Sequence, residues 1–435
     1  MMSTSIMLFT RDLRVRDNPA LAAACEAERV VPVFVFDDAI LTGPFAAANR
    51  VRFLRESVAD LRRSLRELGG DLVVRRGDPV AEVARLAGDT GARSLFLADE
   101  RSAYGTRRLA GLRGLGLDVS ALPGITVVPP GDLTPANGDH YRVFTPYWRA
   151  WDAARRRPAA KTPGRMRLPP GVEPGRPPAD PVPGSPSPGL APGGERAGRA
   201  RLAAWLRDDA ADYEHVRDDL AADRTSRLSP YLKFGCLSPL ELAAAGPEGF
   251  RRQLAWRDFH HQVAAAFPAL PRSDYRPRGR RWNRDRDALD AWRDGMTGIP
   301  IVDAGMRQLR AEGFMHNRAR LITATFLTRH LGIDWRAGLR HFGDWLADGD
   351  IADNAGNWQW VAGTGNSTRP GQVMNPLRQA SRFDPGGDYV RRYVPELAGI
   401  ERSGVHRPWT LPAARRRGLG YPPPITDPDR PASGP

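Results

Sequence analysis

The sequence predicts an α/β domain followed by an all-helical domain, and three observations support this prediction. Short β-rich runs alternate with amphipathic helical patterns over residues 1–130, proline, glycine and arginine crowd residues 131–200, and helical spacing dominates residues 201–435. Nine of the 11 tryptophans lie after residue 200, so the aromatic chemistry belongs to the helical domain. A chain of 435 residues is long enough for two or three domains.

The first domain is expected to be a doubly wound parallel sheet of the Rossmann-like kind. Alternating strands and helices build such a sheet through right-handed crossovers. Ligands of these sheets bind at the carboxyl ends of the strands, so residues 10–17 and 99–105 should line a pocket. Residues 131–200 are expected to be a linker, because their composition buries too little apolar surface to fold alone. The candidate strands are residues 6–9, 30–36, 72–74, 94–98 and 118–122.

Composition excludes several classes of protein. Only Cys25 and Cys236 occur, far apart, so the sequence indicates neither a disulfide framework nor a thiolate metal site. No apolar run approaches the length of a membrane span and no signal-peptide pattern opens the chain, so we expect a cytoplasmic protein. The net charge of +14 favours phosphate backbones or anionic membranes as partners, although a solvated, arginine-rich face gives the same balance.

The most informative stretch is DGDIADNAGNWQW at residues 348–360. It gathers carboxylates, asparagines, glycines and two tryptophans in one short segment. Buried polar groups need partners, so a bound ligand explains the mixture, and a polar helix cap followed by surface aromatics is the alternative.

Two further segments share this mixture of polar and apolar groups. In TSRLS at residues 225–229, hydroxyls surround Arg227 and suit a phosphate, although a helix cap is the alternative. Asn317, Arg320 and Leu321 share one helical face by their spacing. Arg320 is therefore a candidate partner for Asp348.

Together these motifs make the chain resemble the photolyase/cryptochrome family, and within it the class I enzymes that repair cyclobutane pyrimidine dimers. The resemblance covers nearly the whole chain and implies a deoxyribodipyrimidine photo-lyase, a carbon–carbon lyase that uses FAD and light on UV-damaged DNA. It implies no metal and a monomeric protein. The motifs are residues 9–21, 225–229, 256–259, 292–303, 316–320, 333–336 and 348–360, in the family's order.

The resemblance implies that reduced FAD lies in the helical domain. Arg320 would pair with Asp348 over the isoalloxazine, Asp350 would accept the ring's imide N–H, and Asn354 would face N5. An amide at N5 supplies no mobile proton, which favours repair over signalling. The remaining flavin contacts, to phosphates and ribityl chain, would be Tyr213, Thr225, Ser226, Arg227, Leu228 and Ser229.

A tryptophan relay that reduces the flavin in light is also implied, through Trp358, Trp335 and Trp282. Indoles suit this role because they are oxidisable. The alternative for each is a core anchor, which is how we interpret Trp292 and Trp345.

The resemblance also implies a lesion pocket, since photolyases flip the damaged bases out of the duplex. Trp256 and Trp360 would stack on the lesion and Asn317 would hydrogen-bond it. Three positions depart from the family pattern: Gln253 replaces a Glu, Leu321 a Met and Gln372 an Arg. The other implied contacts to lesion or phosphate are Arg217, Arg257 and Arg318.

The resemblance further implies an antenna chromophore in the sheet domain, near Arg50, Asp99 and Glu100. Residues 99–105 favour 8-hydroxy-5-deazaflavin over methenyltetrahydrofolate, and an empty pocket is the alternative. For the whole protein, the alternatives to dimer repair are a cryptochrome-like photoreceptor that binds FAD and a DNA-binding flavoprotein that has lost activity. Repair of (6-4) photoproducts is disfavoured, because that branch has a His pair where this chain has His316 and Asn317.

Overall fold

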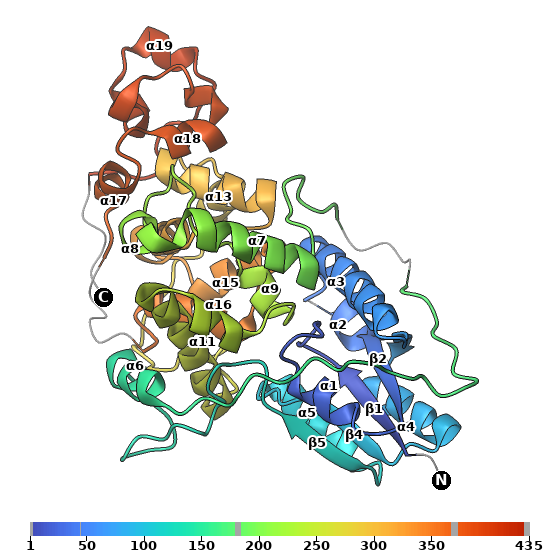
Figure 1. Ribbon diagram of the computed structural model, residues 1–435. Coiled ribbons are helices and arrows are strands. Elements are labelled where there is room, and N and C mark those ends of the chain that lie inside the picture. Colours follow the sequence, from blue (N-terminus) through green and yellow to red (C-terminus); the bar gives the residue numbers. More distant parts are fainter. Residues whose placement is uncertain (1–2, 44, 179–183, 367–372, 430–435) are drawn as a thin grey trace. The chain divides into compact units, whose positions relative to one another are not determined.

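The computed structural model describes residues 3–43, 45–178, 184–366 and 373–429 (Figure 1). The chain packs as two compact units, which do not follow the predicted boundaries at residues 130 and 200. The first unit comprises Met1–Ser185, Ala191–Ala211 and Ser226–Pro268, and the second comprises Pro186–Leu190, Asp212–Thr225 and Ala269–Pro435.

The first unit contains the predicted doubly wound sheet. Its five strands are parallel in the order β3-β2-β1-β4-β5, so the winding reverses between β1 and β4. All five strands overlap their predicted ranges, and β3 extends three residues beyond its predicted end. They are β1 (Thr4–Phe9), β2 (Arg29–Asp37), β3 (Val73–Gly77), β4 (Ser94–Ala98) and β5 (Asp118–Leu122).

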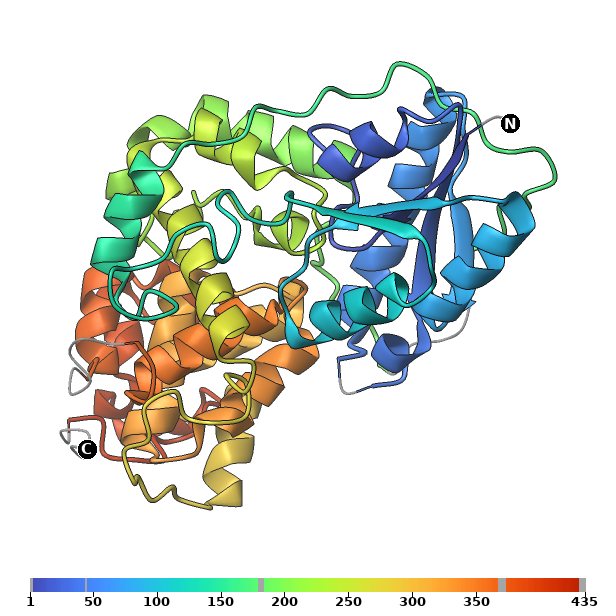
Figure 2. The same ribbon diagram turned by 90° about the horizontal axis from the view of Figure 1, so that it is seen from below.

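Helices cover both faces of this sheet (Figure 2). On one face, Ile6 and Leu8 of β1 pack in a cluster with Leu86 and Leu112 from two of the helices. On the other face, the Ser5 hydroxyl donates to the carbonyl of Ala24. The helices are α1 (Pro19–Ala24), α2 (Asp38–Leu41), α3 (Ala48–Glu67), α4 (Pro79–Thr90) and α5 (Ala103–Arg113).

The segment predicted as a linker is not wholly one. Helix α6 (Phe144–Ala153) lies inside it, and α7 (Glu195–Asp208) begins before residue 200. Helix α6 forms because aromatic residues at helical spacing give it a face to bury, a signal that the surrounding prolines and glycines hid. Three more helices complete the unit: α9 (Ser229–Lys233), α10 (Pro239–Ala245) and α11 (Glu248–Ala266).

The second unit is helical, as predicted for this part of the chain. Its core includes the fully buried indoles of Trp292 and Trp335 and the Trp358 indole, 2% exposed. Among the described residues, no helix is long and apolar enough to cross a bilayer. The helices are α8 (Tyr213–Val216), α12 (Arg286–Asp294), α13 (Pro300–Glu312), α14 (Asn317–Thr325), α15 (Trp335–Trp345), α16 (Ile351–Ala362), α17 (Pro376–Phe383), α18 (Asp388–Tyr393) and α19 (Ala413–Arg417).

Candidate functional site

A pocket in the second unit brings together six of the predicted site residues. It lies among α14, α15 and α16 and encloses about 470 Å³, including its open mouth. The six are Asn317, Arg320, Leu321, Asp348, Asn354 and Trp358. The other lining residues are Ala324, Phe342, Leu346, Asp353, Asn357 and Val361.

Helical spacing explains how two helices line this pocket. On α14, Ala324 extends the face already predicted from Asn317, Arg320 and Leu321 by one more turn. On α16, the lining positions 353, 354, 357, 358 and 361 also recur at three and four residues. Asp353 and Asn357 belong to the predicted polar stretch but were not predicted as site residues, although their spacing from Trp358 was the signal that would have found them.

The Arg320–Asp348 ion pair is present as predicted. One Arg320 nitrogen, Nη2, lies 2.7 Å from an Asp348 oxygen, and Nε donates to the carbonyl of Met315 at 2.8 Å. Asp348 is 7% exposed, so the charge-assisted bond forms largely out of water and fixes the guanidinium at the pocket wall.

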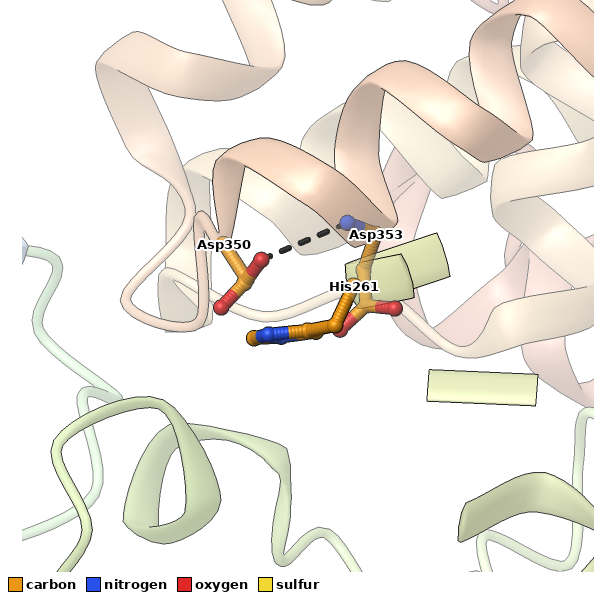
Figure 3. Close-up of side chains that lie close together, drawn as sticks. All are labelled: His261, Asp350 and Asp353. Atoms are coloured by element: carbon orange, nitrogen blue, oxygen red, sulfur yellow. Dashed lines mark hydrogen bonds between the residues drawn. The ribbon is translucent and has the colours of Figure 1, made fainter. Parts of the chain in front are cut away.

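Asp350 is the N-cap residue of helix α16 and accepts from the backbone of Asp353 (Figure 3). It is not among the residues that line the pocket. Its Oδ1 accepts the backbone N–H groups of Ala352 at 2.9 Å and Asp353 at 3.3 Å, which is an N-cap. The cap holds the carboxylate in place, and its contact with the flavin imide stays a prediction.

Asn354 lies at the pocket wall with its amide oriented by the protein. Its Nδ2 donates to the carbonyl of Leu339 on α15, at 3.4 Å. Such a side chain offers hydrogen-bonding atoms that do not titrate.

The three relay tryptophans differ in burial. Trp358 lies at the pocket and packs against Gly338, where any Cβ would collide with the indole ring. Trp335 begins α15 and is fully buried, while Trp282 is half-buried beneath Arg280, whose guanidinium carbon is 4.9 Å from the ring centre. The relay through these three stays a prediction.

Trp292, interpreted as a core anchor, is fully buried and lies next to Trp358. Its ring centre is 6.1 Å from that of Trp358 at an interplanar angle of 74°. Phe342 contacts both indoles, at 4.9 Å from Trp358 and 6.0 Å from Trp292.

The predicted cradle at residues 225–229 has an unusual backbone. Arg227 has φ of +53°, a left-handed conformation that costs free energy for a non-glycine residue and is often found at functional sites. The carbonyl of Ser226 accepts from Arg201 at 2.9 Å, and Ser229 begins α9. Tyr213, the other predicted contact, begins α8 in the second unit, and burial raises the pKa of its phenol to about 12.

The predicted arginine contacts to DNA already have protein partners. Arg318 holds Asp218 through two bonds of 3.2 and 2.8 Å, and Arg217 lies 3.5 Å from Glu214. Arg257 is 8% exposed and donates to the carbonyl of Ile125 at 2.7 Å, so it links α11 to another segment of the first unit.

The predicted aromatic walls lie on α11 and α16. Trp256 stacks on Phe144 with ring centres 3.6 Å apart and planes within 7°. Trp360 is half-buried, on the side of α16 roughly opposite the pocket residue Trp358, because residues two apart on a helix lie about 200° apart. Gln253 is half-buried on α11, and Gln372 lies outside the described residues.

At the carboxyl ends of β1 and β4, most charged groups are paired. Glu100 bonds Arg108 at 3.0 Å and Ser102 at 2.8 Å, and lies 3.6 Å from Arg11. Burial raises the pKa of Glu100, but Arg108 and Arg11 outweigh it and hold that pKa below its ordinary value. Of the predicted antenna contacts, Arg50 donates to the carbonyl of Phe45 at 2.7 Å.

Two polar atoms at these strand ends lack a partner. The Thr10 hydroxyl and one Asp99 oxygen, Oδ1, are buried without a hydrogen bond. The other Asp99 oxygen bonds Arg101 at 2.8 Å. Unpaired buried polar atoms are uncommon, and a missing ligand is one reason for them.

The chain matches known proteins over nearly its whole length. Residues 5–164 match the family described as DNA photolyase, and residues 250–433 match the FAD binding domain of DNA photolyase. A deoxyribodipyrimidine photo-lyase of Streptomyces griseus is 50% identical over 98% of this chain and 97% of that protein.

Two solved structures share the fold over nearly the whole chain. A bacterial class III photolyase from Agrobacterium tumefaciens has a TM-score of 0.89 and 34% identity, covering 98% of this chain and 95% of that one. A cryptochrome from Synechocystis sp. PCC6803 also has a TM-score of 0.89, with 30% identity over 98% and 97%. The predicted fold class and resemblance are therefore confirmed, and the chain belongs to the photolyase/cryptochrome family.

Proposed function

We propose that this protein repairs cyclobutane pyrimidine dimers in UV-damaged DNA with the energy of light. The observation that supports this best is the pocket in which Arg320, Asp348, Asn354 and Trp358 meet. Its place in a domain that matches the FAD binding domain of DNA photolyase supports FAD as its ligand.

The lining residues fit a flavin in their chemistry. Apolar groups such as Phe342 and Leu346 suit the faces of a ring system, while the ion pair and the asparagines suit its polar edge. When bound, reduced FAD supplies the electron that opens the cyclobutane ring after it absorbs blue or near-UV light.

Each polar residue then has a separate task. The Arg320 guanidinium, held by Asp348, binds and orients the ring and favours an anionic flavin by its charge. Asn354 presents an amide that can hydrogen-bond a ring nitrogen and has no proton to lose. The apolar wall excludes water from the ring.

Trp358 is the residue we assign as the inner member of the electron relay. It lines the pocket yet is only 2% exposed, so it can exchange an electron with a bound ring without contact with water. Trp335 and Trp282 are assigned as the next members. No general acid, nucleophile or metal has a part in this scheme.

For DNA, we assign phosphate contacts to the basic surface and lesion contacts to Asn317, Trp256 and Trp360. Arg217 and Arg318 must exchange their carboxylate partners for phosphate, which lowers their net contribution. Leu321 lines the pocket as an apolar wall in place of the family's methionine. A monomeric protein located in the cytoplasm stays part of this proposal.

An antenna chromophore is proposed at the carboxyl ends of β1 and β4, with 8-hydroxy-5-deazaflavin favoured over methenyltetrahydrofolate. The support is the unpaired Thr10 hydroxyl and the unpaired Asp99 oxygen. Glu100 contributes through its ion pairs, which hold Arg11 and Arg108 in place.

A dimer-repair assay tests the proposed function. Purified protein with fully reduced FAD is mixed with an oligonucleotide that carries one cyclobutane thymine dimer, in light and in darkness. We expect dimer loss only in light, and no change to an oligonucleotide with a (6-4) photoproduct. If reduced, flavin-loaded protein leaves the dimer intact in light, the repair function is refuted and the photoreceptor function is favoured. The observation that supports a photoreceptor is the likeness to a cryptochrome structure.

A further inference from the structure

Trp335, proposed as a member of the relay, is bonded to a negatively charged side chain. Its indole nitrogen, Nε1, donates to Oδ1 of Asp274 at 3.0 Å. The indole is fully buried, and the Asp274 side chain is 19% exposed. A carboxylate so close to a largely buried ring acts on the charge of that ring with little screening by water.

The positive charge of Arg336 opposes the effect of the Asp274 carboxylate on the ring, but Arg336 is itself paired with carboxylates. The guanidinium carbon of Arg336 lies 4.5 Å from the centre of the Trp335 ring. Arg336 is itself paired with Asp274 at 2.7 Å and with Asp334 at 3.1 Å. In the part of the chain that the structure describes, two carboxylates thus bond one guanidinium beside Trp335, and these three groups carry a net negative charge.

The second indole beside Trp358, that of Trp292, is bonded to a neutral group instead of a carboxylate. The Trp292 nitrogen donates to a neutral acceptor, the carbonyl of Thr323, at 3.0 Å. Its neighbour His341 lies 5.5 Å away, ring centre to ring centre. Burial, then Arg293 and Arg310, lower the pKa of His341 to about 4, so this ring is uncharged near neutral pH. Arg293 is paired with Asp290 at 3.0 Å, and Arg310 is paired with Asp294 at 2.7 Å.

An oxidised tryptophan is a cation, so these surroundings decide where it is stable. Trp335 and Trp292 belong to the same buried cluster as Trp358. Gly338, one turn after Trp335 on α15, lies against the Trp358 ring. Oxidised Trp358 thus has two candidate electron donors, one bonded to a carboxylate and one bonded to a neutral carbonyl.

We propose that Asp274 directs the relay by stabilising the oxidised form of Trp335, so that Trp335 rather than Trp292 donates to Trp358. This inference rests on the relay in the proposed function. The oxidant that starts the relay is the light-excited, oxidised isoalloxazine, and a soluble thiol restores the last indole.

The step moves one electron and no proton. Trp335 gives an electron to oxidised Trp358 and becomes a radical cation, with its Nε1 proton still in the bond to Asp274. Arg336 bonds the same Asp274 oxygen, which disfavours transfer of that proton to the carboxylate. Asp274 is therefore a positioning residue that acts through charge.

The decisive variant is Asp274→Asn, because an asparagine oxygen still accepts the indole N–H while the charge is lost. We expect the initial rate of light-driven flavin reduction with thiol to fall at least about tenfold, since a unit charge this close acts strongly on a buried ring. The yield of transient tryptophan radical should fall with it, and Asp274→Glu should recover much of both.

The matched control is Asp334→Asn. It removes a charge from the same arginine and keeps an N-cap for α15, but Asp334 does not bond the indole. We expect photoreduction within about twofold of the original protein, since the direct partner of the indole remains. Thermal midpoints and flavin absorbance check the fold of each variant.

A second variant is expected to change the rate of photoreduction in the opposite direction, and its test does not require Asp274→Asn to fold. Arg336→Gln removes the cation over the Trp335 ring, so we expect faster photoreduction and a longer-lived radical. After long illumination in air, peptide mapping should find indole oxidation at Trp335, and in Asp274→Asn a larger share at Trp292.

The outcomes separate this inference from the proposed relay. If Trp335→Phe photoreduces as fast as the original protein, the relay itself is wrong. If Trp335→Phe is inactive in photoreduction while Asp274→Asn is as fast as the original and Arg336→Gln is no faster, the relay stands and the role of Asp274 is refuted.

Discussion

Two polar clusters of this chain have similar composition but differ in how the protein uses them. At the carboxyl ends of β1 and β4, Glu100 takes up Arg108, Ser102 and Arg11, and few polar atoms are left over. In the helical pocket, an ion pair and asparagines surround about 470 Å³ of space. Whether polar residues mark a ligand site therefore depends on how many of their hydrogen bonds the protein itself satisfies.

The ion pair of the pocket gives the largest expected effect. Arg320→Met removes the cation from Asp348, whose side chain is 3% exposed, and should cost about 3 kcal/mol of unfolding free energy, as for other broken buried pairs. FAD should be lost on purification. Denaturant unfolding and flavin absorbance measure the two effects.

An exposed ion pair is the control for that change. Arg52 and Glu56 on α3 lie 2.9 Å apart with side chains 43% and 35% exposed. Arg52→Met should change stability by less than about 1 kcal/mol, as is usual for surface pairs. An equal effect of the two variants would mean that Asp348 is not held out of water.

The charges at the sheet predict a pH-dependent effect of intermediate size. Glu100→Gln leaves Arg11 and Arg108 without their carboxylate and should cost about 2 kcal/mol at neutral pH, because both arginines are mostly buried. FAD content should stay unchanged.

The sign of the pH effect follows from the lowered pKa of Glu100. A carboxyl whose folded-state pKa is depressed stabilises the fold above its ordinary value of 4.5 and loses this contribution as pH falls through the folded pKa. The original protein and Glu100→Gln should therefore converge in stability below pH 4.5. Parallel curves across that range would show that Glu100 is not the cause.

Filling the pocket should affect the flavin more than the fold. Ala324 is 4% exposed at the pocket wall, and Ala324→Phe places a ring where the flavin is proposed. We expect FAD affinity to fall at least about tenfold, equivalent to about 1.4 kcal/mol. Ala110→Phe, on an exposed position of α5, is the control and should retain full flavin content.

The sequence alone located the sheet and one wall of the pocket, and the reasons are physical. Strand and helix periodicities are local, so the five strands and the shared face of Asn317, Arg320 and Leu321 could be predicted. Asp353 and Asn357 followed from the same periodicity and were overlooked.

Other features of the structure could not be predicted from local sequence patterns. No spacing links Asp274 to Trp335, because 61 positions separate them and only the folded chain brings them together. The dual use of a carboxylate is equally hidden, as with Asp350, whose Oδ1 caps a helix in addition to the flavin contact predicted for this residue. Composition also concealed α6, since averages over a proline-rich segment blur a single helix.

The smallest expected effect concerns Thr10, in the polar cluster at the carboxyl ends of β1 and β4. Thr10→Val replaces a buried hydroxyl that has no hydrogen-bond partner with a methyl group of the same shape. Without a chromophore this should raise the unfolding free energy by about 0.5–1 kcal/mol, because an unpaired polar group is removed. With the antenna bound, the same change should weaken its retention, seen as lower chromophore absorbance after purification.

Thr90→Val is the matched control, because the Thr90 hydroxyl on α4 already donates to the carbonyl of Leu86 at 2.5 Å. Thr90→Val should lower the unfolding free energy, so the two substitutions are expected to change stability in opposite directions. If Thr10→Val is destabilising as well, its hydroxyl is satisfied by the protein. The strand ends would then be a closed polar cluster, and the antenna would have to bind elsewhere or be absent.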